Sequence, residues 1–170
     1  MSQPRSLPNA VKLLPISFTK PMKAFKTLST LAILATIALS NLSAAEWTAD
    51  ATAATEKSKA EDKLLLMNFT GSDWCHWCHK IEDEIFSKTE FKEYADQNLV
   101  LLTLDFPSGK VPQSDELKAQ NQKLQQQYGV RGFPTLIVLN AEGEQVGQLG
   151  YTRGGPAAFI AEIDKIKAAL

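Results

Sequence analysis

The chain has 170 residues, of which 44% are hydrophobic and 22% are charged, a composition that excludes a wholly disordered chain and collagen-like repeats. With 18 Lys and Arg against 19 Asp and Glu, the formal net charge is −1, so no excess of positive charge is available to neutralise nucleic-acid phosphates. The length predicts one domain with a tail, and two cysteines, Cys75 and Cys78, cannot form a disulfide framework.

The N-terminal segment has the features of a targeting sequence. Residues 28–39 form an apolar run without a charge, which is too short for a membrane-spanning helix of about 20 residues. Two lysines precede this run and small residues follow it, the order found in a secretory signal peptide. We predict a signal peptide that starts at Met22 and is cleaved after Ala45 (residues 22–45), with an uncleaved membrane anchor as the alternative.

This division assigns residues 1–45 to an N-terminal extension with the signal peptide and residues 46–170 to one folded domain. Residues 1–45 hold five of the 18 basic residues and none of the 19 acidic ones, so the domain carries a net charge of −6. We therefore expect a periplasmic or secreted protein, where disulfides are permitted. Closing a loop between positions as near as Cys75 and Cys78 restricts the unfolded chain little, so the pair is better explained by reactivity than by stability.

The first half of the domain contains two predicted helices and two predicted strands. Residues 47–59 are rich in Ala, Thr and Lys and predict a leading helix. Residues 63–70 and 99–105 are apolar runs of strand length, typical of strands buried on both faces. Between them a helix is expected from Cys75 through Ile85, and a capping box at residues 87–90 predicts a kink or restart.

The second half predicts a loop at 106–113, a polar helix at 114–128, a strand at 134–139 and, after a Glu-Gly turn, a shorter strand at 145–149. A final helix from residues 154–156 carries one apolar stripe, formed by Phe159, Ile160, Ile163, Ile166 and Leu170. Strands separated by helices pair in parallel, and a closing hairpin adds an antiparallel edge. The order βαβαββα, after the leading helix, therefore predicts an α/β fold with a central mixed four-stranded sheet flanked by helices.

The segment Cys75-His76-Trp77-Cys78 follows a buried strand and opens a helix. Unpaired backbone N–H groups at a helix N-terminus favour negative charge, which lowers the pKa of a thiol placed there. Cys78 lies one turn further along the same face, where it can attack a mixed disulfide at Cys75. The placement predicts two-step thiol–disulfide exchange, with Cys75 as nucleophile and Cys78 as resolving residue.

Three neighbours are candidate supporting residues. A protonated His76 beside the nucleophile would stabilise the thiolate further, although a solvated turn residue is the simpler interpretation. Trp74 and Trp77 would flank the pair with apolar surface for partner docking, or serve plain packing. The candidate substrate-binding residues are Phe133 and Pro134, because a proline just before an apolar strand lies at the strand start or edge. The sequence does not determine whether the Phe133–Pro134 peptide bond is cis or trans.

Two motifs together resemble the thioredoxin superfamily. Trp74-Cys75-x-x-Cys78 follows a buried strand, and Gly132-Phe133-Pro134-Thr135 precedes another. The resemblance covers about residues 64–170. Residues 71–91 are most similar to extracytoplasmic thioredoxin-like proteins, among them the C-terminal periplasmic domain of the transmembrane thiol reductant conveyor.

The resemblance implies a thioredoxin-like fold and roles for the site residues. It implies that Cys75 is an exposed nucleophile and Cys78 a buried resolving cysteine. Pro134 would be a cis-proline packed against the pair, and the backbone of Phe133 would pair with an extended substrate segment. Trp74 would match the family tryptophan before the first cysteine.

The chain departs from the family pattern at several positions. His-Trp replaces the usual Gly-Pro between the cysteines, and Asn68 takes the place of the buried carboxylate of thioredoxin if one residue is inserted before the motif. No lysine accompanies it in the second strand. These departures leave open whether protons pass through a buried acid, and the alternatives are solvent, His76 or His79. They also leave open the direction of electron flow.

Three other functions compete with this interpretation. Cys75-x-x-Cys78-His79 matches the haem attachment pattern, but His76 is too close to be the second axial ligand and Met67 lies in a predicted buried strand. A metal site of both cysteines and both histidines would crowd its four ligands into five residues, whereas zinc sites usually draw ligands from two segments. A non-catalytic thioredoxin-fold binding module is the third.

We thus expect an extracytoplasmic thiol–disulfide oxidoreductase that acts on protein disulfides or dithiols and has no bound cofactor or metal. Reductase is favoured, with oxidase or isomerase as the alternative. The redox cycle requires a membrane-bound or soluble thiol electron donor. We expect a monomer that binds no nucleic acid.

Overall fold

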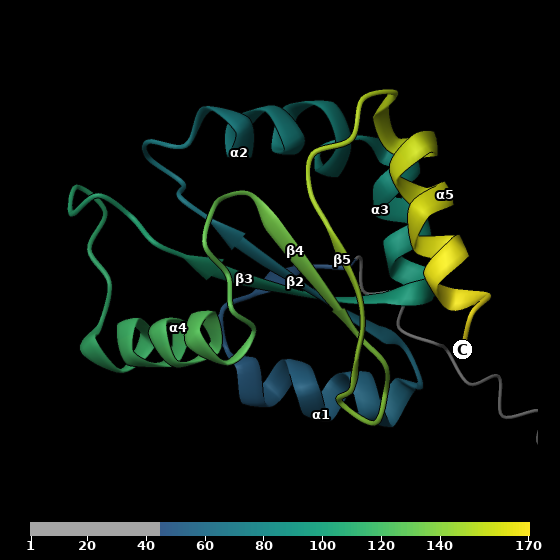
Figure 1. The fold of residues 1–170 in the computed structure, drawn as a ribbon, viewed down its shortest axis with the longest axis horizontal. Coiled ribbons are helices and arrows are strands. Elements are labelled where there is room, and N and C mark those ends of the chain that lie inside the picture. Colours follow the sequence, from purple (N-terminus) through teal and green to yellow (C-terminus); the bar gives the residue numbers. More distant parts are fainter. Residues whose placement is uncertain (1–44) are drawn as a thin grey trace, which may run out of the picture. The chain divides into compact units, whose positions relative to one another are not determined.

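The computed structural model describes residues 45–170, and the predicted signal peptide, apart from its last residue Ala45, lies outside these residues. The five strands form one sheet in the order β1-β3-β2-β4-β5 (Figure 1). Within the described part, no helix is long and apolar enough to span a membrane. The elements in chain order are β1 (Trp47–Thr48), α1 (Ala51–Glu61), β2 (Leu64–Thr70), α2 (His76–Ile81), the π-helical turn η1 (Glu82–Phe86), α3 (Thr89–Asn98), β3 (Leu99–Asp105), α4 (Asp115–Gln127), β4 (Thr135–Leu139), β5 (Gln145–Leu149) and α5 (Gly155–Lys167).

The central strand β2 explains why its sequence is apolar throughout. It pairs in parallel with β3 and antiparallel with β4, and every residue from Leu64 to Thr70 is buried. A strand with neighbours at both edges and helices on both faces has no side exposed to water. β5 closes the sheet antiparallel to β4. The predicted mixed α/β sheet is therefore confirmed.

The predicted number of strands is wrong by one, because the chain before α1 forms an additional edge strand. β1 pairs in parallel with β3, with Trp47 opposite Leu101. The leading helix starts only at Ala51, and its N-cap residue Asp50 accepts hydrogen bonds from the N–H groups of Thr52 and Ala53 at 2.9 and 3.0 Å. A strand of two residues shows no alternation of polar and apolar side chains, so its sequence does not distinguish it from the helix that follows.

Helices cover both faces of the sheet (Figure 1), with α1 and α4 on one face and α2, α3 and α5 on the other. The core under α1 and α4 contains the alternate strand residues Leu65, Met67, Phe69, Val100, Leu102, Leu104, Ile137 and Leu139. The opposite core centres on Phe86, whose ring lies 4.9 Å from that of Phe91 and 5.7 Å from that of Phe159. These two cores hold the end of β2, where the cysteine motif begins, in a fixed position.

The predicted restart after α2 is confirmed, but the capping box is wrong. The helix widens into η1 and α3 begins at Thr89, with Lys88 as N-cap residue and no side-chain cap. Ser87 is unavailable because its hydroxyl donates to the carbonyl oxygen of Asp83 in the preceding turn. On α5, Phe159 and Ile163 are buried and Ile160 and Ile166 partly buried, whereas Leu170, expected on the same stripe, lies beyond the helix and is exposed.

Candidate active site

The two cysteines lie at the junction between β2 and α2. The chain turns after Thr70, and the N–H of Cys75 donates to the carbonyl oxygen of Gly71 at 2.9 Å. Cys75 is the N-cap residue of α2, and its Sγ accepts a hydrogen bond from the N–H of Cys78 at 3.2 Å. The Cα atoms are 5.2 Å apart and the sulfur atoms form a disulfide. The first turn of the helix thus brings both sulfurs together, with the first at the helix start.

Burial of the pair differs from the expectation for Cys75. Cys78 is 4% exposed, as expected of a buried resolving residue, but Cys75 is only 5% exposed. In the disulfide-bonded state the sulfur of Cys75 is bonded to that of Cys78 and accepts a hydrogen bond from the N–H of Cys78. Little of the Cys75 surface is therefore accessible to solvent. The neighbours Trp74 and Trp77 are 51% and 48% exposed. The surface that surrounds the disulfide is therefore aromatic.

Trp74 connects the motif to two distant segments. Its Nε1 donates to the carbonyl oxygen of Phe106 at 2.8 Å, and its ring meets Phe133 edge to face at 5.8 Å. Phe106 and Phe133 stack on each other at 5.1 Å. These three rings link the motif, the loop after β3 and the segment before β4. Trp74 therefore packs against both segments while about half of its surface is accessible to solvent.

The Phe133–Pro134 peptide bond is cis, the isomer that the resemblance implied. Phe133 and Pro134 are both half-buried and lead directly into β4. The hydroxyl of Thr135 donates to the carbonyl oxygen of Gly132 at 2.7 Å and closes the turn. A Cβ atom on Gly150 would lie 3.8 Å from the carbonyl oxygen of Pro134, so the chain after β5 also reaches this segment.

Trp77, between the two cysteines in sequence, contacts a polar network that the sequence analysis missed. Its ring lies 5.6 Å from His76, which is exposed, and 5.3 Å from Tyr151. The Tyr151 hydroxyl donates to Glu84 at 2.5 Å, and Lys80 approaches Glu84 at 2.9 Å. The hydrogen bond with Tyr151 is the main cause that lowers the pKa of Glu84, and the same bond raises the pKa of Tyr151.

Three of the side chains that the haem and metal interpretations require, Cys75, Cys78 and His79, are engaged in other bonds, whereas His76 is exposed. His79 Nε2 donates to the carbonyl oxygen of Ser72 at 2.7 Å, and both sulfurs are bonded to each other. Among residues 45–170, no group of three or more His, Cys, Asp and Glu side chains is arranged to hold a metal ion.

A cavity of about 250 Å³ lies behind Cys78. Asn68 from β2 and Thr103 from β3 stand opposite each other in the sheet register and both line it. Asn68 is 6% exposed, and its Oδ1 has no hydrogen-bond partner within the described chain. Glu82, the first residue of η1, also lines this cavity. The sequence analysis identified Asn68, whereas no motif indicated that Glu82 would line this cavity.

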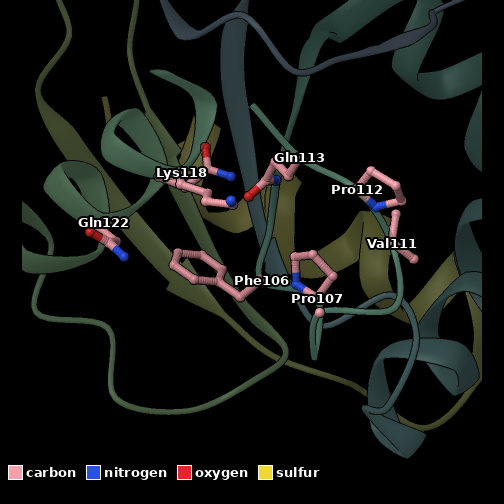
Figure 2. A pocket seen from close by; sticks show the side chains of 9 residues that line it. Phe106, Pro107, Val111, Pro112, Gln113, Lys118 and Gln122 are labelled. Carbon is pink, nitrogen blue, oxygen red and sulfur yellow. The ribbon is translucent and has the colours of Figure 1, made fainter. Parts of the chain in front are cut away.

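A second cavity, of about 460 Å³, lies between the loop after β3 and α4. Figure 2 shows Phe106, Pro107 and Pro112 from the loop facing it, with Lys118 from the helix. It contains none of the predicted site residues. Phe106 connects it to the motif, through Trp74 and Phe133, so this cavity lies beside the candidate active site and not in it.

Comparisons with known proteins agree with this geometry. A family model described as a thioredoxin-like domain matches residues 51–167. The chain is 44% identical over 117 residues to the disulfide bond reductase DsbH of Chlamydia pneumoniae, covering 69% of this chain and 68% of that protein. A solved DsbH oxidoreductase is similar with 40% identity and a TM-score of 0.67, over 71% of this chain and 83% of that one.

The C-terminal domain of DsbD from Neisseria meningitidis, in its oxidised form, shares the fold with a TM-score of 0.50 and 20% identity, over 71% of this chain and 98% of that domain. The region matched by the family model includes both cysteines and the cis-proline. The chain therefore belongs to the thioredoxin-like domain family, and its reaction is thiol–disulfide exchange.

Proposed function

We propose that this protein is an extracytoplasmic reductase of protein disulfides. The observation that carries the proposal is the position of the cysteine pair: Cys75 caps α2 and accepts a hydrogen bond from a helix N–H group, with Cys78 bonded to it one turn along. N–H groups at a helix start stabilise a thiolate. The similarity to a disulfide bond reductase supports the reducing direction.

In the reducing direction the Cys75 thiolate attacks one sulfur of a substrate disulfide. A mixed disulfide forms and the other substrate sulfur leaves as a thiolate. Cys78 then attacks the Cys75 sulfur, which forms the Cys75–Cys78 disulfide and releases the second substrate thiolate. Two electrons pass from the protein to the substrate, and a membrane-bound or soluble thiol donor returns them.

The substrate surface follows from the residues around the disulfide. Trp74 comes directly before Cys75 and Trp77 directly before Cys78, and both side chains are half exposed. The Phe133 backbone, held by the cis bond to Pro134, is the proposed pairing edge for an extended substrate segment. His76 is proposed to stabilise the thiolate. We further propose that residues 22–45 direct the chain to the periplasm or outside the cell, and that it acts as a monomer.

Cysteine variants test the assignment of roles. Cys75→Ser is expected to abolish the reduction of insulin disulfides, because no nucleophile remains. Cys78→Ser is expected to accumulate mixed disulfides with substrate proteins, because Cys75 still attacks but nothing resolves the product. Normal turnover by the Cys75→Ser variant would contradict the assignment.

The reduction potential of residues 46–170 tests the direction. A value near that of thioredoxin, about −270 mV, supports a reductase. A value near that of DsbA, about −120 mV, would contradict it and favour an oxidase or isomerase.

A further inference from the structure

The loop between β5 and α5, residues 150–155, borders the dithiol, and thiol–disulfide exchange uses none of its side chains. Two of its glycines show where it runs. A Cβ atom on Gly150 would lie 3.8 Å from the carbonyl oxygen of Pro134, and one on Gly155 would lie 3.9 Å from that of Glu84 on η1. The loop therefore passes along one side of the active site, from the cis-proline to the π-helical turn (Figure 1).

Arg153 is the cation of this loop, and its side chain is exposed. Two residues earlier, the ring of Tyr151 lies 5.3 Å from that of Trp77. Hydrogen bonding with Glu84 is the main cause that raises the pKa values of Lys80 and Tyr151, and the positive charge of Arg153 opposes both rises. Because charge effects in water fade with distance, Arg153 lies close to both of these groups and thus beside the exposed ring of Trp77.

The positive charge on this surface is not balanced by the carboxylate nearby. One oxygen of Glu84 is 2.9 Å from Lys80 Nζ, and the other accepts the hydroxyl of Tyr151. That hydroxyl is the main cause that lowers the pKa of Glu84, and the charges of Lys80 and Lys88 lower it further. Among the ion pairs of the described chain, none includes Arg153. The guanidinium is therefore available to a partner, on a domain whose net charge of −6 is otherwise acidic.

We propose that Arg153 determines substrate specificity by binding an acidic side chain, Asp or Glu, close in sequence to the substrate half-cystine. The proposal rests on the proposed function and concerns only which disulfides are preferred. A substrate segment paired with the Phe133 backbone lies next to Pro134, where the loop with Arg153 begins. A guanidinium presents parallel donors that match both oxygens of a carboxylate. The half-exposed ring of Trp77 would cover the apolar stem of the same side chain.

Peptide disulfides that differ only in the residues flanking the cysteine test this preference. We would compare Glu, Gln and Lys at these positions in single-turnover reduction by the reduced protein, measured as released peptide thiol. Each rate is divided by the rate with dithiothreitol, an uncharged dithiol, to correct for the reactivity of the peptide itself. The Glu peptide should react about threefold faster than the Gln peptide at low ionic strength, as expected of an exposed ion pair, and the Lys peptide more slowly. In 1 M salt, where the Debye length is about 3 Å, the preference should disappear.

Arg153→Gln should abolish the preference, and Arg153→Glu should reverse it in favour of the Lys peptide. A reversal separates a charge contact from loss of structure, which would slow all three peptides alike. Lys123→Glu is the matched control, because it makes the same change in net charge at an exposed position of α4, on the opposite face of the sheet. This variant should keep the wild-type preference.

The outcomes separate the two proposals. Equal rates for the three peptides with the wild-type protein would overturn the role of Arg153, as would an unchanged preference in Arg153→Glu. A shift of equal size in Lys123→Glu would also overturn it, because the overall charge of the domain would then be the cause. Failure of the wild-type protein to reduce any of the three peptides would instead contradict the proposed function.

Discussion

The indole Nε1 of Trp74 donates a 2.8 Å hydrogen bond to the carbonyl oxygen of Phe106, 32 residues further along the chain. Asp73 links the same two segments, because its carboxylate accepts hydrogen bonds from the N–H and the hydroxyl of Ser108 at 2.8 and 2.7 Å. The residues just before the dithiol therefore hold the loop after β3 against the active site.

Gly71→Ala is expected to disturb this arrangement. A Cβ atom at Gly71 would lie 2.5 Å from Cε2 of Trp74, so the indole must move and lose its bond to Phe106. Because the displaced indole is half exposed and can move toward solvent, the expected cost in urea unfolding is that of the lost hydrogen bond, about 0.5–1.5 kcal/mol, with a change in tryptophan fluorescence. Gly132→Ala is the control, since nothing lies within 4 Å of a Cβ atom there. Equal stability of the two variants would contradict this prediction.

Asp73→Asn is expected to destabilise the protein in a pH-dependent manner. The hydrogen bonds from Ser108 are the main cause that holds the pKa of Asp73 below its ordinary value. A carboxyl group with a lowered folded-state pKa contributes stability above its unfolded pKa and loses it as pH falls through the folded value. The variant should therefore be less stable than wild type at neutral pH, and the difference should vanish in strong acid. A difference independent of pH, in urea unfolding at both conditions, would show that the charge is not the cause.

His76→Ala is expected to raise the pKa of the Cys75 thiol in the reduced protein. His76 is the first residue of α2, directly after Cys75, and a cationic neighbour favours the thiolate. The change would appear in a titration of thiolate ultraviolet absorbance. His76→Lys, which keeps a positive charge, should retain the lowered pKa. An unchanged titration in His76→Ala would leave His76 as a solvated turn residue.

Tyr151→Phe is expected to weaken substrate binding and to leave the reduction potential unchanged. The variant keeps the ring 5.3 Å from Trp77 but removes the hydroxyl that donates to Glu84. Without that bond the Trp77–Tyr151 surface is less firmly held, and KM for a protein disulfide should rise several-fold while kcat changes little. A change in potential without a change in KM would place Tyr151 in control of the dithiol instead.

The core of the fold was predictable because its strands are buried on both faces. Continuous apolar runs at Leu64–Thr70 and Leu99–Asp105 are strands β2 and β3 in the structure. The dithiol was predictable as well, since its two cysteines and the helix start are adjacent in sequence. The two wrong predictions of secondary structure concern a segment too short to show a pattern and a motif that fits two different hydrogen-bond arrangements. A two-residue strand has no periodicity, and the serine of an apparent capping box bonds backward to Asp83.

The amino-acid sequence alone determined that a reactive cysteine pair opens a helix after a buried strand, because strand burial and helix capping are local properties written in neighbouring residues. Only the tertiary structure decided what surrounds that pair. Tyr151 reaches Glu84 across 67 positions, and Asn68, Glu82 and Thr103 meet in one cavity behind Cys78. Contacts of this kind depend on how separate segments pack against one sheet, and side-chain periodicity along a single segment carries no record of them.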